Sequence, residues 1–246
     1  MLCKIKIPFE SRRRLNYDFS ASSVMQGVMM ETIPAFYAEK MHSLALRPYS
    51  QYSACLNGHN VWTVSVLSHE AYDNIITPLL ALRSAEIRHK NDIITFAGAD
   101  TEILSYQELL AENAALSGTS DTLTLDFITP TAFKSSGNYI ILPTLRLIFQ
   151  SLAKRFDTFF GIDDNNYDDL LGDIDKYVRA TDYELASSSF SLEGVRIPSF
   201  KGSITLRVKA PSELRSYIRM LCRFAEFSGV GIKTAIGMGS VRYHSK

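Results

Sequence analysis

The segment GVGIKTAIGMG (residues 229–239) lies between a long amphipathic helix pattern that begins at Pro211 and a short strand pattern over Ser240–Tyr243. Four glycines in eleven residues let a backbone approach a ligand closely and aim N–H groups at phosphate oxygens, while Lys233 adds a charge. The segment is not a P-loop, because Ile232 precedes Lys233 and the four-residue spacer is missing. Nor is it a dinucleotide fingerprint, because it follows a helix. We expect a phosphate-binding loop or, alternatively, a glycine-rich hairpin without a ligand.

The helix pattern before this segment runs to about Phe227 and carries three arginines at four-residue intervals. This spacing puts Arg215, Arg219 and Arg223 on one helical face, while apolar residues cover the other. Like charges at this spacing repel one another, a cost that bound phosphates would remove. The face is therefore expected to contact phosphates or else to be simply solvated.

Charge is unevenly distributed along the chain. The 26 basic and 26 acidic residues balance overall, but residues 157–193 hold 2 basic and 10 acidic side chains, and residues 196–246 hold 10 and 2. A basic block of this kind predicts a surface for an anionic ligand, most economically a nucleic acid. The alternative is that the acidic and basic blocks face each other.

Composition excludes several classes of protein. A hydrophobic fraction of 46% argues against general disorder. Every apolar run ends well before the roughly 18 residues that a membrane-spanning helix needs. The alternating start Lys4-Ile5-Lys6-Ile7 does not resemble a signal peptide, and the three cysteines lie too far apart to suggest a disulfide framework or a zinc knuckle. We expect a cytoplasmic, reduced protein.

The first half of the chain alternates strand and helix patterns. The predicted elements are, in order, strand 4–7, helix 20–44 split by Pro34, strand 47–56, an Asn57-Gly58 turn, strand 61–66, helix 68–82, strand 92–96 and a short helix 105–115. Strand, helix, strand, strand, helix, strand is the order of the ferredoxin-like unit.

The second half repeats this order without a visible sequence repeat. Its predicted elements are strand 123–127, a Gly137-Asn138 turn, helix 143–160, an acidic loop with a short helix over 162–175, strands 183–192 and 203–209, helix 211–227 and strand 240–243. The fold class is therefore α+β, with two tandem ferredoxin-like (βαββαβ) domains over 1–117 and 118–246. The small, polar run 116–120 marks the boundary.

Among the five histidines, His42 has the most suggestive setting. It ends a helix pattern that also contains Tyr37 and Lys40, and the basic-aromatic run Arg47-Pro48-Tyr49 follows. A histidine can exchange protons near neutral pH, and nearby cations can stabilise a pentacoordinate phosphate. A purely structural histidine is the alternative. No H-E-x-x-H or G-x-S-x-G motif is present, and the paired aspartates of the acidic stretch lack calcium-loop spacing.

Three features together resemble the CRISPR-associated repeat-RNA endoribonucleases of the RAMP superfamily. They are the glycine segment after a helix, Thr129-Pro130-Thr131 with Phe133 before Pro143 and an aromatic-rich helix, and His42 followed by residues 47–50. The resemblance spans essentially the whole chain, including the two ferredoxin-like halves. The glycine segment is shared by RAMP proteins generally, and its combination with the His42 segment indicates the processing nuclease.

The resemblance implies metal-independent cleavage of precursor CRISPR RNA within its repeat, without a cofactor. A ribose 2′-hydroxyl would attack the adjacent phosphate, leaving 2′,3′-cyclic phosphate and 5′-hydroxyl ends. His42 would be the general acid or base, and Tyr37 and Lys40 would assist it. Residues implied to bind RNA are Arg47 and Tyr49, which could also replace these helpers, the arginines Arg215, Arg219 and Arg223, and the loop residues Gly229, Gly231, Lys233, Gly237 and Gly239.

The implied partners are CRISPR repeat RNA and subunits of a CRISPR effector complex, with no membrane, for a monomer or homodimer. Two other functions stay open. A RAMP protein can be a non-catalytic RNA-binding subunit of an effector complex, and the presence of His42 favours the nuclease over it. A ferredoxin-like nucleotide-binding domain would instead bind a free nucleotide and have no affinity for repeat RNA.

Overall fold

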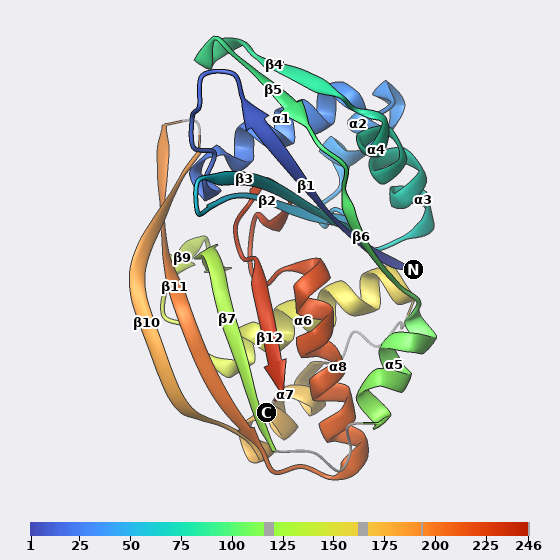
Figure 1. Cartoon of the computed structure of the whole chain (residues 1–246). Coiled ribbons are helices and arrows are strands. Elements are labelled where there is room, and N and C mark those ends of the chain that lie inside the picture. Colours follow the sequence, from blue (N-terminus) through green and yellow to red (C-terminus); the bar gives the residue numbers. More distant parts are fainter. Residues whose placement is uncertain (116–120, 162–166, 193, 246) are drawn as a thin grey trace. The chain divides into compact units, whose positions relative to one another are not determined.

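A computed structural model describes residues 1–115, 121–161, 167–192 and 194–245 (Figure 1). The chain divides into two compact units. Unit 1 contains Met1–Ile103 and Ala235–Gly237, and unit 2 contains Leu104–Thr234 and Met238–Lys246. The predicted domain boundary at 116–120 lies outside the described residues, so the division into 1–117 and 118–246 stays a prediction.

Unit 1 is a ferredoxin-like sheet with helices. Its elements are β1 (Leu2–Ser11), α1 (Ser22–Thr32), α2 (Ala35–Ser43), β2 (Tyr49–Leu56), β3 (His59–Val66), α3 (His69–Ala71), a single π-helical turn (Tyr72–Ile76), α4 (Thr77–Ala81), β4 (Ser84–Ile87), β5 (Asp92–Phe96) and β6 (Asp100–Leu104). The strand order is β2-β3-β1-β5-β4, with β6 also paired to β1. Numbering β1, β2, β3 and β5 as strands one to four gives the ferredoxin-like order 4-1-3-2.

The local sequence pattern explains which residues of unit 1 are buried and where its helices and strands end. In β1, Ile5, Ile7 and Phe9 point into the core, and Ile5 pairs with Val64 of β3 in antiparallel register. Pro34 cannot continue a helix, and it separates α1 from α2 as the sequence predicts. Asn57 and Gly58 both adopt positive φ, which is the geometry of a two-residue hairpin turn between β2 and β3.

Unit 2 repeats the topology. Its elements are α5 (Tyr106–Ala115), β7 (Thr122–Thr131), β8 (Phe133–Ser135), β9 (Asn138–Ile140), α6 (Leu145–Phe160), α7 (Tyr167–Tyr177), β10 (Val178–Leu192), β11 (Val195–Val208), α8 (Ser212–Ser228) and β12 (Val241–Ser245). The sheet order β10-β11-β7-β12 is again 4-1-3-2. Leu123, Leu125 and Phe127 of β7 are buried. Helices α6 and α8 lie against one face of this sheet (Figure 1). The predicted fold class of two tandem ferredoxin-like domains is therefore confirmed.

Several elements differ from the sequence-based expectation. The strands predicted over 183–192 and 203–209 are a long hairpin of 15 and 14 residues, β10 and β11. Most of β10 is exposed, so it lacks the alternating apolar pattern that marks a strand. Short β4 and β6 were not predicted for the same reason. Among the described helices, none is both long and apolar enough to cross a membrane.

Candidate functional site

His42 lies in the last turn of α2 with an exposed side chain. Tyr37 and Met41 are four residues apart and therefore share the buried face of this helix. His42 follows Met41 and lies outside that face. Within the described residues the His42 ring has no hydrogen bond or ion pair. Its nitrogens are therefore available to a bound molecule.

The two predicted helpers of His42 differ in exposure. Tyr37 is fully buried, and its hydroxyl has no hydrogen-bond partner among the described residues. Burial, reinforced by Glu70 and Tyr49, raises the pKa of Tyr37 well above its usual value. Lys40 is exposed, forms an ion pair with Glu70, and holds its Nζ atom 5.8 Å from the centre of the Tyr37 ring. Of the two, only Lys40 presents a polar group at the surface.

The basic-aromatic run after α2 folds back on the helix. Arg47 is half-buried, and its Nε donates a hydrogen bond of 2.9 Å to the Met41 carbonyl oxygen. Tyr49 begins β2 and is fully buried, with Gln26 donating to its hydroxyl at 3.4 Å. Burial raises the pKa of Tyr49, which Gln26 and Arg47 partly oppose. Tyr49 exposes no face of its ring in this structure, and its implied role in RNA binding stays a prediction.

Three of the four glycines in residues 229–239 direct their N–H groups at acceptors within the protein. The N–H groups of Gly229, Gly231 and Gly239 all donate to protein acceptors. These are the Ala225 carbonyl oxygen at 2.9 Å, the Ser151 hydroxyl at 2.8 Å and the Pro130 carbonyl oxygen at 3.0 Å. The N–H groups of Val230, Ile232, Met238 and Ser240 are occupied as well. Because protein atoms take these donors, the loop is a packed structural segment more than an open phosphate cradle.

Close backbone contacts explain the need for glycine at two of these positions. A Cβ atom at Gly231 would come within 2.3 Å of the Ala132 carbonyl oxygen, and one at Gly239 within 2.0 Å of the Val230 carbonyl oxygen. Both glycines also have positive φ, 80° and 70°, which other residues rarely adopt. Lys233 itself has φ 56° and is half-buried. The glycines serve the packing of the loop.

The tip of the loop, Ala235–Gly237, belongs to unit 1. Ala235 is part of its buried core, and its carbonyl oxygen accepts a hydrogen bond of 3.3 Å from the Gln51 side chain. A Cβ atom at Gly237 would come within 2.1 Å of the Ser22 side chain. Gly237 is therefore a close-contact position of unit 1.

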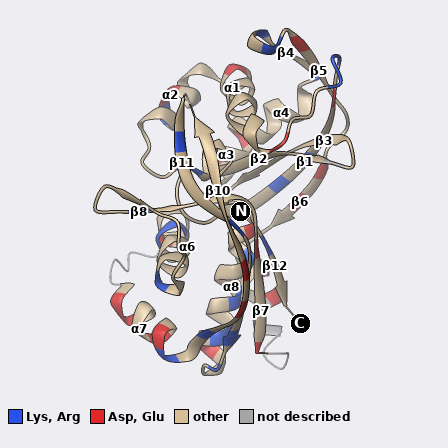
Figure 2. Cartoon of the chain, turned by 90° about the vertical axis from the view of Figure 1, so that its left-hand side faces the viewer, with Lys and Arg blue, Asp and Glu red and all other residues tan. Residues whose placement is uncertain are grey.

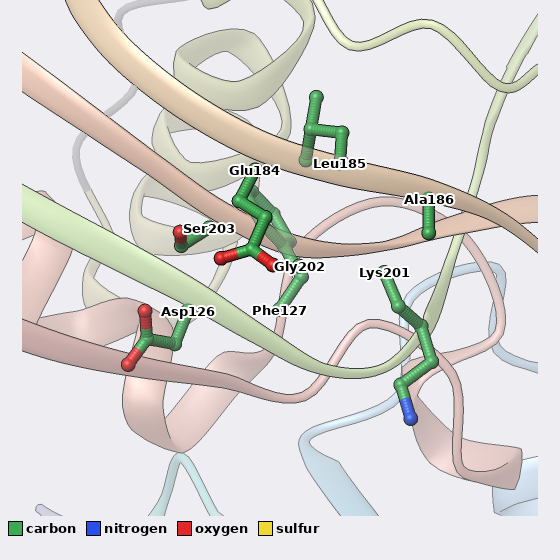
Figure 3. Close-up of a pocket in the computed structure, with 8 residues that line it drawn as sticks. All are labelled: Asp126, Phe127, Glu184, Leu185, Ala186, Lys201, Gly202 and Ser203. Carbon is green, nitrogen blue, oxygen red and sulfur yellow. The ribbon is translucent and has the colours of Figure 1, made fainter.

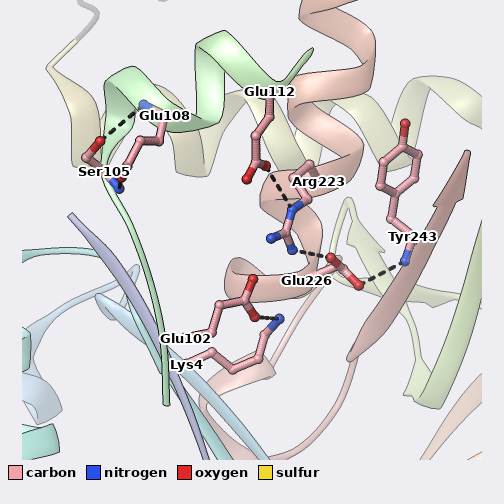
Figure 4. Close-up of polar contacts among 8 residues, drawn as sticks. All are labelled: Lys4, Glu102, Ser105, Glu108, Glu112, Arg223, Glu226 and Tyr243. Carbon is pink, nitrogen blue, oxygen red and sulfur yellow. Dashed lines mark hydrogen bonds and ion pairs between the residues drawn. The ribbon is translucent and has the colours of Figure 1, made fainter. Parts of the chain in front are cut away.

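The three arginines of α8 do not form an exposed stripe. Arg219 is only 1% exposed. Arg215 forms an ion pair of 2.9 Å with Asp121, and Figure 4 shows Arg223 between Glu112 and Glu226. Glu226 also accepts a hydrogen bond of 3.2 Å from the Tyr243 N–H. The prediction of a solvent-facing phosphate stripe is wrong at Arg219, because α8 is buried on more sides than its apolar residues alone indicate.

A polar region on the sheet of unit 2 was not predicted. A pocket of about 620 Å³ lies along β7, β10 and β11. Asp126, Glu184 and Lys201 are among the residues that line it (Figure 3). Asp126 also contacts the exposed His244 of β12, with 2.9 Å between its Oδ2 and the histidine Nε2. The two residues are 118 positions apart, so no local motif could reveal this histidine–carboxylate pair.

Basic and acidic residues both occur along the elements of unit 2 (Figure 2). The acidic side chains of α7 include Asp175, which pairs with Arg146 of α6. Arg215 and Arg223 of the basic block pair with carboxylates at 121, 112 and 226, which lie outside the acidic block 157–193. These ion pairs therefore support neither a uniformly basic surface over residues 196–246 nor a direct pairing of that block with the acidic block 157–193.

Comparison with known proteins gives a consistent set of relatives. The family model described as CRISPR-associated endoribonuclease Cas6 matches residues 125–241. A CRISPR-associated endoribonuclease Cas6 of Mycobacterium tuberculosis is 34% identical over 226 residues, covering 89% of this chain and 70% of the relative. One of Streptococcus thermophilus is 30% identical over 224 residues, covering 89% of this chain and 90% of the relative.

The fold has similar solved structures. One, a Cas6 product complex, has a TM-score of 0.81 at 20% sequence identity and covers 99% of this chain and 100% of its own. At this identity the similarity shows the fold, and it agrees with the topology of both units.

Proposed function

Because this chain belongs to the Cas6 family of CRISPR-associated endoribonucleases, we propose that it cleaves precursor CRISPR RNA within the repeat through attack of a ribose 2′-hydroxyl on the adjacent phosphate. His42 is the general acid or base of this reaction. The reaction needs neither a metal ion nor a cofactor, because the nucleophile belongs to the substrate itself. The role of the protein is to align the RNA and to transfer protons.

The bonds and protons balance in a single transesterification. The 2′-oxygen forms a bond to phosphorus as the bond from phosphorus to the 5′-oxygen breaks. The 2′-hydroxyl gives up its proton, and the departing 5′-oxygen receives one. A histidine suits either transfer because its ordinary pKa lies near neutrality. The products are a 2′,3′-cyclic phosphate and a 5′-hydroxyl.

The observation that carries the proposal is the exposed side chain of His42 in the last turn of α2, the same turn whose Met41 carbonyl oxygen holds Arg47. Arg47 is held by its hydrogen bond to the Met41 carbonyl oxygen, one residue from His42. A guanidinium fixed in this way can stabilise the additional negative charge of a pentacoordinate phosphate without reorganising. In this proposal Lys40 assists at the surface, while the buried Tyr37 fixes the orientation of α2.

RNA binding extends the proposal beyond the reacting phosphate. Arg47 and Lys233 are half-buried predicted RNA contacts with no ion pair among the described residues, whereas the half-buried Arg215 and Arg223 pair with carboxylates. The glycines of residues 229–239 hold the loop in shape, so they support Lys233 instead of binding the RNA through their own N–H groups. Binding to effector-complex subunits stays an expectation.

The test is cleavage of cognate repeat RNA in excess EDTA. Wild type should produce a 2′,3′-cyclic phosphate, and a 2′-deoxy substitution at the scissile nucleotide should abolish the cut. His42→Ala should reduce the cleavage rate by about 10²- to 10⁴-fold, the usual contribution of general acid–base catalysis. Because His42 is exposed, the variant should unfold at the same temperature as wild type.

His244→Ala is the matched control, because it also removes an exposed histidine. Unlike His42, His244 has a carboxylate partner, Asp126. It should cut at the wild-type rate. If His244→Ala abolished cleavage and His42→Ala did not, the catalytic assignment would move to the His244–Asp126 pair. Repeat RNA that wild type binds without cutting would contradict the proposed reaction and favour an RNA-holding role.

A further inference from the structure

Arg155 of α6 carries a buried charge beneath the glycine loop. Arg155 is only 6% exposed. Its Nη2 atom donates to the Gly231 carbonyl oxygen at 3.3 Å. One helical turn earlier, the Ser151 hydroxyl accepts the Gly231 N–H at 2.8 Å. Both polar backbone groups of Gly231 are therefore held by side chains of the same helix.

No carboxylate neutralises Arg155 within the part of the chain that the structure describes. Other arginines of unit 2 differ in this respect, since Arg146 pairs with Asp175 and Arg215 with Asp121. The carbonyl contact at 3.3 Å is longer than a typical N–H···O hydrogen bond and uses one of the five N–H donors of the guanidinium. Burying a cation with so little compensation is unfavourable unless another group completes its contacts.

The charge persists at neutral pH. Burial lowers the pKa of Arg155 to about 10, which still leaves the guanidinium protonated under physiological conditions. Lys233 lies two residues beyond Gly231 on the same loop and also has no ion-pair partner among the described residues. Two basic residues without a described carboxylate partner therefore belong to one short loop and the helix that supports it.

We infer that the guanidinium of Arg155, oriented by its contact with the Gly231 carbonyl oxygen, binds a single anionic oxygen, and that a backbone phosphate of the RNA substrate supplies it. The inference rests on the proposed function for the identity of the polyanion. The remaining N–H donors of a guanidinium are suited to phosphate oxygens, and a charge already desolvated binds an anion more strongly than one in water. Because the contact would be to a phosphate, it would position RNA without reading its sequence.

The rival explanation is that Arg155 only braces the loop through its contact with the Gly231 carbonyl oxygen. The two explanations make opposite predictions for a variant that removes the charge but keeps the apolar stem. Arg155→Met should weaken RNA binding if the charge meets a phosphate. If Arg155 is only a brace, Arg155→Met should lower stability and leave RNA affinity per folded molecule unchanged.

The experiment uses the full chain, a repeat RNA that carries a 2′-deoxy substitution at the scissile nucleotide, and inorganic phosphate as an independent probe. Phosphate should raise the melting temperature of wild type and not that of Arg155→Met. The variant should bind the RNA about tenfold more weakly, the size of one hydrogen bond to a charged group. The slope of log affinity against log salt concentration should fall by about one.

Lys154→Gln is the matched control, since it removes an exposed charge from the neighbouring position of α6. It should leave the phosphate-induced shift intact. Arg155→Lys keeps a charge at the site and should retain part of that shift, so it provides the test if Arg155→Met does not fold. A wild-type melting temperature that phosphate does not change, or equal RNA affinity in wild type and Arg155→Met, would overturn the inference.

Failure of this inference can be told apart from failure of the proposed function. In Arg155→Met the KM for RNA should rise by a larger factor than any fall in kcat, because Arg155 is proposed to act on binding. The proposed chemistry is tested separately by His42→Ala and the 2′-deoxy substrate. If wild type cuts by that chemistry and Arg155→Met binds RNA normally, only the anion site is excluded.

Discussion

The glycine loop and the helix α2 are built in opposite ways. In the loop, the N–H groups of Gly229, Gly231 and Gly239 are all bonded to protein atoms. Helix α2 instead turns His42 outward with no described partner, while its inner side packs through Tyr37 and Met41. The conspicuous sequence motif therefore reflects the demands of folding. The residue proposed for catalysis lies in a segment with an ordinary composition.

This contrast has a measurable consequence. Substitutions in the glycine loop should act mainly on the free energy of unfolding, because they disturb tightly packed backbone. Substitutions on the outer side of α2 should act mainly on RNA cleavage, because they disturb few internal contacts. A loop variant that changes only activity, or an α2 surface variant that unfolds the protein, would break the comparison.

The largest effect on stability is expected for Gly239→Ala. The added Cβ atom would lie 2.0 Å from the Val230 carbonyl oxygen, a backbone atom that cannot move without disturbing the loop. The residue also has φ 70°, which is unfavourable for alanine. The steric and conformational costs together should lower the free energy of unfolding by about 3 kcal/mol. Urea unfolding of purified protein measures this change.

Gly172→Ala is the control for the same substitution in the same unit. Gly172 lies inside α7, and a Cβ atom there would meet nothing within 4 Å. Alanine has the higher helix propensity, so the variant should be more stable by about 0.5 to 1 kcal/mol. Equal effects of Gly239→Ala and Gly172→Ala would mean that the loop is not tightly packed.

The fold could largely be predicted from the sequence because most elements carry a clear period or a turn residue. The strand over 61–66 alternates, Pro34 divides a helix, and Asn57-Gly58 marks a hairpin, and each of these local signals agrees with the structure. The starts of β10 and β11 could not be predicted. The early residues of β10 are mostly exposed, so no buried face imposes a pattern on them. The early residues of β11 include the buried Ile197, Ser199 and Phe200, and their strand conformation depends on pairing with β10.

An intermediate effect is expected for Tyr37→Phe. The substitution removes a buried hydroxyl that has no described hydrogen-bond partner, so at neutral pH the variant should be as stable as wild type or more stable by about 1 kcal/mol. RNA cleavage should continue at the wild-type rate, since a buried hydroxyl does not reach the substrate. Urea unfolding and a cleavage time course give the two measurements.

The same variant has a distinct pH dependence. Burial raises the pKa of Tyr37 in the folded protein, so above about pH 10 the unfolded chain loses a proton that the folded protein keeps. Wild type therefore loses stability from this group as pH rises, and Tyr37→Phe does not. The stability difference should grow in favour of the variant above about pH 10. A loss of cleavage in Tyr37→Phe would instead restore the tyrosine as a direct helper of His42.

The candidate site was less predictable than the fold, because side-chain exposure depends on contacts far apart in sequence. Helical spacing correctly grouped Arg215, Arg219 and Arg223, but it could not show that Arg219 is buried. Nothing in the sequence indicates that Arg155 of α6 is largely buried and contacts Gly231, which is 76 residues away. His244 and Asp126 meet only because β12 pairs with β7.

The smallest effect on stability is expected for Lys40→Gln and Glu70→Gln. Their ion pair is exposed, with side-chain exposures of 45% and 52%, so either substitution should change the free energy of unfolding by less than about 1 kcal/mol. RNA binding separates the two variants. If Lys40 meets a phosphate, Glu70→Gln removes a competing carboxylate and should tighten binding at low salt, whereas Lys40→Gln should weaken it. If Glu70→Gln binds RNA more tightly and Lys40→Gln more weakly, while both keep the stability of wild type, then Lys40 contacts the RNA together with His42. If both variants bind RNA as wild type does, then Lys40 does not contact the RNA and only forms its ion pair with Glu70.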